Sequence, residues 1–406
     1  MYRSNHQSSK KHSQNRRSFR NNQFRKPEQQ NRKMFHSTMN VNQLINKVND
    51  EAFIKPTEHV LRHQFGDFKI DPRLKGNITK RGYVSPTPIQ DQTIPAGLEG
   101  KDIIGIANTG TGKTAAFLIP LINKMLINRS EQVLVLAPTR ELASQISEEF
   151  YEFAKGLSLS SVLCIGGTGY YHQQKMFRHN VNFVIGTPGR IIDLLNRKVF
   201  SLSRFRNIVL DEADRMVDMG FIKDIRLILG QLPAERQSFF FTATLEPKVE
   251  ELIRQFTNNP VRVSVKIRQT PTNIEQDIVH VPHNKAAKQN VLIEMLKKSE
   301  FKKVLVFCRT KNGTDKVVKA LQGFGIKSNA IHGNKSQNYR MKALDYFKKG
   351  KIQVLVATDV AARGLDINEV SHVINFDIPA NYEDYIHRIG RTGRADKSGK
   401  ALTFVT

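Results

Sequence analysis

The sequence contains only two cysteines among 406 residues, Cys164 and Cys308, and they lie far apart along the chain. Neither belongs to a CxxC pair or to a cluster of cysteines and histidines, so the sequence predicts no zinc site and no disulfide framework. Long apolar runs are also missing: no stretch is long enough to cross a bilayer, and the N-terminus lacks the apolar centre of a signal peptide. These absences argue against a membrane role and favour a reducing compartment, the cytoplasm.

Acidic residues are scarce relative to basic ones. The chain carries 63 Lys and Arg against 37 Asp and Glu, a formal net charge of +26. Such an excess favours binding to a polyanion, chiefly through release of condensed counterions, although a basic chain also gains solubility from its charge. The imbalance is greatest in residues 1–40, where ten basic residues and one acidic residue, Glu28, stand among Asn, Gln and Ser.

We expect residues 1–45 to form a disordered basic tail, because this segment has too little apolar surface to offset the entropy of ordering. Three interpretations of the tail remain open. It is an RNA-binding tail whose basic residues hold phosphates while its aromatics stack on unpaired bases, a solubilising tail, or an organellar transit peptide that would replace the cytoplasm by an organelle. We favour the RNA-binding tail.

After the tail, short β-branched runs alternate with helix-like stretches such as Glu141 to Lys155. Near-continuous apolar strands separated by helices indicate a parallel sheet covered on both faces, with ligands at the carboxyl ends of the strands. The strand-like runs are 102–106, 133–136, 182–185, 207–210, 276–281, 303–307, 353–356, 372–376 and 401–405.

The length of the chain fits two or three domains. The strand and helix alternation pauses from about Asn258 to Asn273, a stretch that contains Pro260 and Pro271, and then resumes. We therefore predict two α/β domains, residues 46–263 and 274–406, joined by a linker at 264–273. A ligand in a cleft between two such domains controls their relative position.

Residues 107–114 read Ala-Asn-Thr-Gly-Thr-Gly-Lys-Thr and connect a strand to a helix. The backbone N–H groups of a glycine-rich loop at a helix N-terminus make a cradle for phosphate. Lys113 reaches the outer phosphates, and the Thr114 hydroxyl is suited to ligate Mg²⁺. The strand, loop and helix context makes a chance glycine-rich turn a poor alternative, although the first position is Ala107 where the general pattern has Gly.

Residues 211–214 read Asp-Glu-Ala-Asp and follow another apolar strand. An acidic tetrapeptide alone is more often a helix start than a metal site. Beside a phosphate loop, however, Asp211 is placed to hold Mg²⁺ and Glu212 to orient and deprotonate the attacking water.

A third motif near the C-terminus, residues 387–394, contains Arg391 and Arg394. Arginines supplied across a domain cleft neutralise charge that develops on a γ-phosphate. A basic surface turn or an RNA-contacting loop is the alternative, and it is compatible with the catalytic role.

Together these motifs resemble the DEAD-box RNA helicases of the second helicase superfamily, in order from about Phe65 to the last residue. The family has Ala at the head of its phosphate loop, as this sequence has. The resemblance implies two tandem RecA-like domains that hydrolyse ATP with Mg²⁺ when RNA is bound.

The resemblance also assigns residues to the nucleotide. Tyr83 and the upstream Phe65 match aromatics at the adenine, Gln90 matches the glutamine that reads the adenine edge, and Arg391 and Arg394 match the arginine fingers. The ATP-binding set is Phe65, Tyr83, Gln90, Ala107, Thr109, Gly110, Thr111, Gly112, Lys113, Thr114, Gly364 and Asp366, with Asp366 at the ribose.

For RNA, the resemblance implies a backbone-facing set rich in Thr, Gly, Pro and Arg, residue types that suit contacts to phosphate and not to base edges. The helix after Pro188 resembles the wedge that bends one strand. The set is Pro138, Thr139, Arg140, Gly166, Gly167, Thr187, Pro188, Gly189, Arg190, Arg309, Thr310, Gln337, Arg340, Thr358, Asp359 and Arg363. A smaller set is expected to couple the two domains: Asp214, Thr242, Thr244 and His387.

Two departures from the family pattern stand out. The usual Ser-Ala-Thr motif is Thr242-Ala-Thr244 here; a hydroxyl is retained, so we expect coupling to survive. The chain also ends at Thr406, directly after a strand, where relatives usually continue into a helix. This is consistent with a minimal core or with a second sheet that is less covered on one face.

Three hypotheses about function are considered. The leading hypothesis is a monomeric RNA helicase that locally unwinds RNA, with ribosomal or other ribonucleoprotein particles as partners. The second is an ATP-dependent clamp on RNA that scarcely unwinds it. The third is a translocating DNA helicase, which Tyr83, Gln90 and the Asp211 to Asp214 box argue against.

Overall fold

The structure is a computed structural model that describes residues 60–108, 110–178, 180–265, 274–362, 367, 370–393 and 399–406. The predicted tail and five predicted site residues lie outside the described residues. Those five are Thr109, Arg363, Gly364, Asp366 and Arg394.

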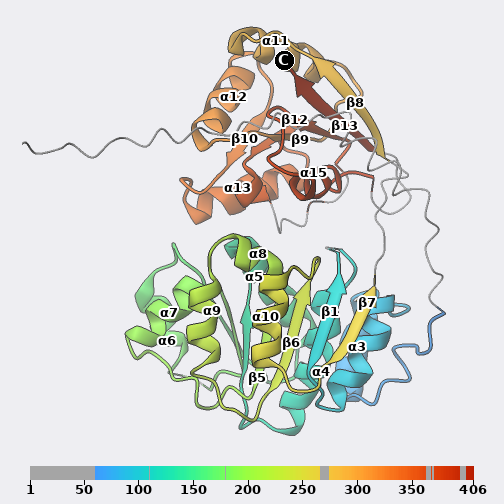
Figure 1. Cartoon of the computed structure of the whole chain (residues 1–406), viewed down its shortest axis with the longest axis vertical. Coiled ribbons are helices and arrows are strands. Elements are labelled where there is room, and N and C mark those ends of the chain that lie inside the picture. Colours follow the sequence, from blue (N-terminus) through green and yellow to red (C-terminus); the bar gives the residue numbers. More distant parts are fainter. Residues whose placement is uncertain are drawn as a thin grey trace, which may run out of the picture. The chain divides into compact units, whose positions relative to one another are not determined.

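The first domain contains a seven-stranded sheet whose strands all pair in parallel, in the order β3-β4-β2-β5-β6-β1-β7 (Figure 1). The strands are β1 (Ile103–Ala107), β2 (Val133–Leu136), β3 (Ser161–Cys164), β4 (Phe183–Gly186), β5 (Asn207–Leu210), β6 (Gln237–Thr242) and β7 (Val261–Val265). The helices are α2 (Pro72–Lys80), α3 (Pro88–Leu98), α4 (Lys113–Ile127), α5 (Arg140–Phe153), α6 (Tyr170–Met176), α7 (Pro188–Asn196), α8 (Ala213–Asp218), α9 (Ile222–Leu229) and α10 (Pro247–Phe256).

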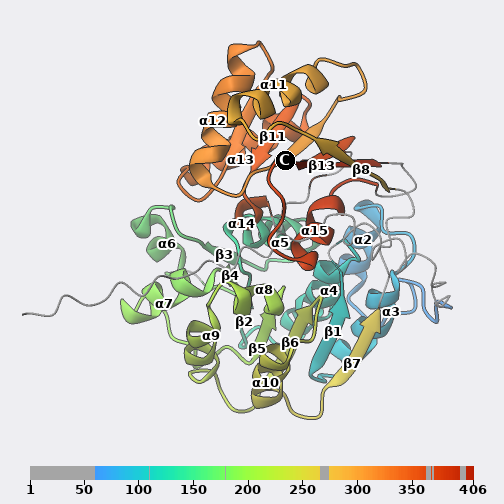
Figure 2. The same cartoon turned by 45° about the horizontal axis from the view of Figure 1, so that its top comes forward.

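The second domain contains a six-stranded parallel sheet in the order β10-β11-β9-β12-β13-β8. Its strands are β8 (Ile274–His280), β9 (Val304–Phe307), β10 (Ser328–Ile331), β11 (Val354–Ala357), β12 (His372–Asn375) and β13 (Gly399–Val405). Its helices are α11 (Lys285–Leu296), α12 (Lys311–Gly323), α13 (Gln337–Lys348), α14 (Asp359–Ala362) and α15 (Tyr382–Ile389) (Figure 2).

Each sheet is buried on both faces, as continuous apolar strands require. In β2, Val133 and Val135 pack into the cluster under α3, α4 and α5, while Leu134 and Leu136 pack into the cluster under α7, α9 and α10. The second sheet is likewise covered by α11 and α12 on one face and by α13 and α14 on the other. The prediction of two parallel sheets flanked by helices is confirmed.

Strand β7 falls within the stretch that was expected to lack regular structure, and it extends to Val265, inside the segment predicted as a linker. It lies at the edge of the sheet, where Val263 and Val265 are buried and Arg262 and Ser264 are exposed. Residues 266–273 of that segment lie outside the described residues.

The strand order decides which loops become neighbours. The loops after β1, β5 and β6 carry residues 107–114, 211–214 and 242–244, and these three strands are adjacent. The loops after β2, β3 and β4 carry residues 138–142, 166–167 and 187–190, and these strands form the other half of the sheet. Two separate groups of predicted site residues therefore lie side by side at the carboxyl ends of the strands of the first sheet.

Candidate functional site

The phosphate loop joins β1 to α4 and turns through two glycines with positive φ, Gly110 (84°) and Gly112 (91°). Such φ values favour glycine. The Lys113 ammonium donates to the carbonyl of Ala107 at 2.9 Å, and the Thr111 hydroxyl donates to the carbonyl of Asn108 at 2.8 Å. The loop is therefore closed on itself by its own side chains, with α4 beginning at Lys113.

Helix α3 holds this loop from outside. The Thr87 hydroxyl donates to the Thr111 carbonyl at 2.8 Å, and the Gln90 amide donates to the Gly112 carbonyl at 3.0 Å. The Gln90 side-chain oxygen accepts the Thr87 backbone N–H at 2.9 Å. Gln90 is almost fully buried, so little water competes with these hydrogen bonds and its side chain holds the loop in place.

The two predicted adenine aromatics pack against each other. The rings of Phe65 and Tyr83 meet edge to face with centroids 5.8 Å apart, and the Tyr83 ring also contacts Phe153. The Tyr83 hydroxyl donates to Glu149 at 2.8 Å. Burial and the charge of Glu149 raise the pKa of Tyr83.

Asp211 and Glu212 follow β5 and are both buried. The Asp211 carboxylate accepts the Glu212 backbone N–H at 3.0 Å. The Glu212 carboxylate accepts from the Arg215 guanidinium at 2.6 Å. Glu212 has φ 52°, an uncommon conformation for a non-glycine residue that tends to occur at functional sites.

The two carboxyl groups differ in acidity. Burial raises the pKa of Asp211 to about 6, with the charge of Lys113 opposing this shift and the charges of Glu212 and Asp214 adding to it. Burial also acts to raise the pKa of Glu212, but the positive charges of Arg215, Lys113 and Arg391 outweigh it and hold that pKa below its usual value. Glu212 is therefore the stronger acid of the two, and Asp211 is a buried carboxyl group that feels the positive charge of Lys113.

Asp214 anchors the loop after β6. Its carboxylate accepts the backbone N–H groups of Ala243 and Thr244 at 2.8 and 2.9 Å. The Thr242 hydroxyl donates to the Thr244 carbonyl at 2.6 Å, and Thr242 is fully buried. These contacts join the Asp211 to Asp214 box to the Thr242 to Thr244 motif within the first domain.

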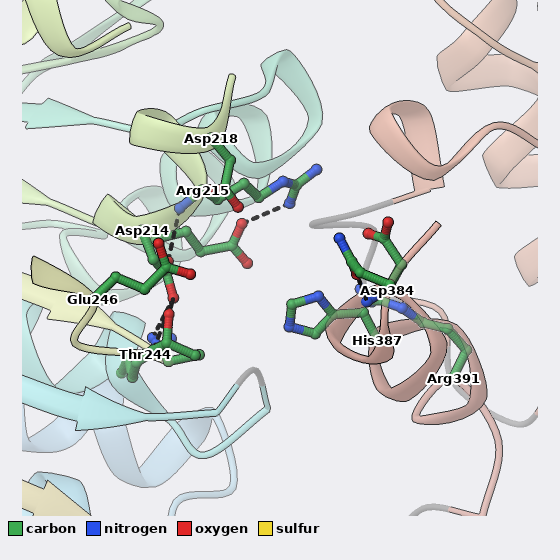
Figure 3. Close-up of a pocket in the computed structure, with 12 residues that line it drawn as sticks. Asp214, Arg215, Asp218, Thr244, Glu246, Asp384, His387 and Arg391 are labelled. Carbon is green, nitrogen blue, oxygen red and sulfur yellow. Dashed lines mark hydrogen bonds and ion pairs between the residues drawn. The ribbon is translucent and has the colours of Figure 1, made fainter. Parts of the chain in front are cut away.

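A cavity of about 350 Å³, the phosphate-loop pocket, lies between these residues and the second domain. Figure 3 shows Asp214 and Thr244 on one side of it, with Asp384, His387 and Arg391 on the opposite side. The structure thus brings Lys113, Glu212 and Arg391, three of the five predicted catalytic residues, to one pocket. Its full lining is Lys113, Glu212, Asp214, Arg215, Asp218, Ala243, Thr244, Glu246, Asn381, Asp384, His387 and Arg391.

The residues fit Mg²⁺ only in company with phosphate oxygens. Among the described residues, no group of three or more His, Cys, Asp or Glu side chains is arranged to hold a metal ion. Mg²⁺ at nucleotide sites usually takes one or two protein ligands and completes its shell with phosphates and water. The buried Asp211 carboxylate would supply one such ligand, and Thr114 stands in the first turn of α4.

A second cavity of about 440 Å³, the Arg140 pocket, gathers most of the RNA set predicted for the first domain. The Arg140 guanidinium lies against Gly166 and Gly167, where a Cβ atom on either glycine would come within 2.8 Å of it. Arg190 donates to Gln173 and to Asp193, each at 2.8 Å. The lining is Pro138, Thr139, Arg140, Glu141, Gly166, Thr187, Gly189, Arg190, Asp193, Met219, Phe221, Arg340 and Val360.

Glu141 links this pocket to the second domain. Its carboxylate accepts from the Arg340 guanidinium at 2.6 Å and from the Gln337 amide at 3.2 Å. Both charged side chains are at least nine-tenths buried. Burial lowers the pKa of Arg340, and the charge of Glu141 opposes that shift. Two predicted RNA residues therefore contact an acidic side chain of the first domain here.

The other described residues of the RNA set in the second domain are held by contacts within that domain. Arg309 donates from its backbone to Asp377 at 2.8 Å, and Thr310 caps α12. Thr358 is buried and precedes Asp359, whose two oxygens both accept from Arg388, at 2.6 and 2.9 Å. None of these four predicted residues lines the Arg140 pocket.

The sequence reasoning missed three residues that organise these sites: Glu141, Gln173 and Arg215. Arg215 had a signal, because it stands three positions after Glu212, a spacing that brings helical side chains together. Gln173 had none: it donates to the Leu163 and Ile165 carbonyls and accepts from Arg190, contacts that only the fold creates.

No helix among the described residues is long and apolar enough to cross a membrane.

Comparison with known proteins agrees with this geometry. The DEAD/DEAH box helicase model matches residues 87–252, and the helicase conserved C-terminal domain model matches residues 287–396. The ATP-dependent RNA helicase CshA of Listeria monocytogenes is 46% identical over 344 residues, which are 84% of this chain and 66% of that protein. The DEAD-box ATP-dependent RNA helicase CshA of Bacillus subtilis is 45% identical over 84% of this chain and 69% of its own length.

Solved structures are similar as well. S. cerevisiae Dbp5 bound to RNA and ADP BeF3 is 31% identical with a TM-score of 0.75, covering 84% of this chain and 89% of Dbp5. Mss116p with its NTE and C-tail deleted, bound to ssRNA and AMP-PNP, is 30% identical with a TM-score of 0.77, covering 86% of this chain and 76% of that one. The chain spans about two thirds of the CshA proteins named above, and the predicted fold of two RecA-like domains is confirmed. The chain belongs to the family of DEAD-box ATP-dependent RNA helicases.

Proposed function

We propose that this chain hydrolyses ATP to unwind or remodel RNA locally, and that hydrolysis requires RNA because the site is complete only when the two domains meet. The observation that carries the proposal is the phosphate-loop pocket, whose lining combines Lys113 and Glu212 of the first domain with His387 and Arg391 of the second. We place the limits of these domains at residues 46–263 and 274–406, with β7 extending the first domain to Val265 and a linker after it.

In the nucleotide site, Lys113 binds the outer phosphates and Glu212 orients and deprotonates the attacking water. Asp211 and Thr114 would hold Mg²⁺, which supplies charge neutralisation at the phosphates when it is bound. Arg391 and Arg394 stabilise the charge that develops on the transferred phosphoryl group. The position of Glu212 supports this assignment, because it lines the phosphate-loop pocket together with Lys113 and Arg391.

The loop contacts support further nucleotide roles. Gln90 holds the Gly112 carbonyl and reads adenine with its remaining hydrogen-bonding capacity, while Tyr83 and Phe65 supply the aromatic contacts to the base. The backbone N–H groups of the phosphate loop cradle the phosphates. Gly364 and Asp366 complete the site from the second domain.

In the RNA site, Arg140 and Arg190 contact phosphates while Thr139, Thr187 and the glycines beside them offer backbone and hydroxyl groups. Such contacts hold a strand without reading its sequence, so little sequence specificity is expected. Arg309, Thr310, Thr358 and Arg363 continue the path in the second domain. The residues that line the Arg140 pocket support this path because they come from three adjacent strand ends and from the second domain.

The test is a pair of assays on the purified chain. ATP hydrolysis is measured without nucleic acid, with single-stranded RNA and with single-stranded DNA, and strand displacement is measured on a short RNA duplex at limiting enzyme. We expect strong stimulation by RNA, little by DNA, and ATP-dependent displacement. Equal stimulation by DNA contradicts an RNA enzyme, and stimulation by RNA without displacement indicates an ATP-dependent clamp.

A further inference from the structure

Helix α8 and the turn after it contact both pockets. Asp214, Arg215 and Asp218 line the phosphate-loop pocket, and Met219 and Phe221 line the Arg140 pocket. A short helix at one site that continues into a turn at the other can transmit a displacement between them. The side chain that leaves this helix toward the second domain is Arg215.

The Arg215 guanidinium holds two acceptors on different domains. One terminal nitrogen donates to the Glu212 carboxylate at 2.6 Å, and the other donates to the backbone carbonyl of Val360 at 3.3 Å. Arg215 is only 6% exposed; its contact with Glu212 is buried, and its contact with the Val360 carbonyl is partly buried. A guanidinium suits this position because its planar fork fixes two acceptors at once, which a lysine ammonium on a flexible stem does not.

Val360 stands between the two proposed sites. Its side chain lines the Arg140 pocket, and its carbonyl accepts from Arg215, which lines the phosphate-loop pocket. It follows Thr358 and Asp359 directly, and Asp359 is clamped by two hydrogen bonds from the buried Arg388 of α15. The carbonyl of Val360 is thus held in place by the same helix that leads to Arg391.

We propose that Arg215 is a positioning residue that links the orientation of the Glu212 carboxylate to the Thr358–Val360 segment of the second domain. RNA bound at this segment would then fix the Glu212 carboxylate in the orientation that hydrolysis requires. The inference rests on the proposed function, because it takes Glu212 as the base and Thr358 as an RNA contact. With the Val360 carbonyl in place, the Arg215 fork is fixed at both ends and Glu212 has one orientation. Without it, one arm of a buried guanidinium loses its acceptor, which disfavours that arrangement.

The chain offers two informative variants and a matched control. Arg215→Lys keeps the charge but loses the fork, and Arg215→Gln loses both. The control is Arg226→Lys on α9, where an exposed arginine donates to Glu251 at 2.8 Å and lines neither pocket. The full chain carries each change, and each protein is checked by its thermal unfolding midpoint and by binding of a fluorescent ATP analogue.

ATP turnover is then measured with and without a single-stranded RNA of defined length. We expect both Arg215 variants to lower the RNA-stimulated kcat by about tenfold or more while the KM for ATP changes by less than about threefold, since a small misplacement of a catalytic group acts on turnover rather than on binding. The ratio of RNA-stimulated to RNA-free turnover should fall with kcat. Arg226→Lys should behave as the unmodified chain does.

Two outcomes overturn the inference. In the first, both variants keep an RNA-stimulated kcat within twofold of the unmodified chain. In the second, analogue affinity, unfolding midpoint and turnover fall together, which indicates a structural role only. If the unmodified chain shows no stimulation by RNA, the proposed function itself fails, and that result is distinguishable because it appears before any variant is compared.

Discussion

The two pockets lie at the carboxyl ends of the strands of the same sheet, but they differ in how their acidic residues are paired with basic ones. In the Arg140 pocket, Glu141 and Asp193 are each neutralised by arginine, at 2.6 and 2.8 Å. In the phosphate-loop pocket, Glu212 is paired with Arg215, but Asp211 behind it has a pKa raised to about 6 by burial. The first arrangement presents a neutral to positive surface that suits a phosphate backbone, and the second leaves a negative charge that suits a metal cation. This difference supports the proposal that hydrolysis takes place in the phosphate-loop pocket and that the Arg140 pocket positions RNA.

The largest effect is expected from removing the proposed base, Glu212, from the phosphate-loop pocket. Glu212→Gln keeps the shape of the side chain and its contact with Arg215, so ATP and RNA should still bind. RNA-stimulated turnover should fall by about 10³, the range for loss of general base catalysis. Single-turnover hydrolysis and equilibrium binding of labelled RNA with ATP measure the two effects. Unimpaired turnover would remove Glu212 from its assigned role.

A smaller effect is expected at the acidic residue of the other pocket. Glu141→Gln removes the charge that neutralises the buried Arg340, and loss of one partner of a buried pair is costly. We expect RNA affinity in the presence of a non-hydrolysable ATP analogue to fall by about 100-fold, because the pair forms across the two domains.

The matched control for this change is Glu148→Gln, two turns along α5 at an exposed position. Its RNA affinity should equal that of the unmodified chain. ATP affinity in the absence of RNA should be the same in all three proteins, since Glu141 does not line the phosphate-loop pocket. Equal RNA affinity of Glu141→Gln and Glu148→Gln contradicts a role for the pair in closure.

Much of the fold was predictable because the buried strands carry their own signal. Strand β2 is four consecutive apolar residues, and its predicted limits are those observed. Strands β3, β6, β7 and β10 were not predicted. Strands β3, β7 and β10 lie at sheet edges and carry polar residues, such as Arg262 and Ser264 in β7 and Ser328 and Asn329 in β10. Strand β6 is central and fully buried, but it begins with the polar residues Gln237 and Ser238. An edge strand is fixed by its single neighbour, which a local pattern does not reveal.

The candidate site divides in the same way. Lys113, Asp211 and Glu212 were assigned from local spacing, because a phosphate loop and a strand-end carboxylate are short continuous motifs. The Glu141 contact to Arg340 joins residues 199 positions apart, and the Arg215 contact to Val360 joins residues 145 positions apart. Pairings of this kind depend on the packing of two domains and leave no periodic trace in the sequence.

The different acidity of the two carboxyl groups gives a pH-dependent test of stability. Because burial raises the pKa of Asp211 from 3.8 to about 6, the folded protein binds a proton there more tightly than the unfolded chain does. The stability that this group contributes is present at low pH and is lost as pH rises through about 6. Without metal or nucleotide, Asp211→Asn should therefore stabilise the protein at pH 8, by about 3 kcal/mol.

Urea unfolding from pH 4 to 8 in the presence of a chelator measures this difference. The advantage of Asp211→Asn should shrink as pH falls below about 6, where the native carboxyl becomes protonated. Asp277→Asn, at an exposed position on β8, is the control and should show no such trend. A difference that does not vary with pH contradicts an uncompensated charge at Asp211.

The smallest effect is expected where the sequence departs from its family. In Thr242 the hydroxyl donates to the Thr244 carbonyl at 2.6 Å, a contact that Thr242→Ser retains, and the lost methyl group lies in a fully buried position. We expect a loss of about 1 kcal/mol in stability, with ATP turnover and strand displacement each changed less than about twofold. Thr242→Val keeps the volume but removes the hydroxyl, so it should lower displacement per ATP hydrolysed because the loop held by Asp214 loses an internal bond. If serine instead raises displacement several-fold at unchanged turnover, the threonine methyl itself limits the coupling between the two pockets.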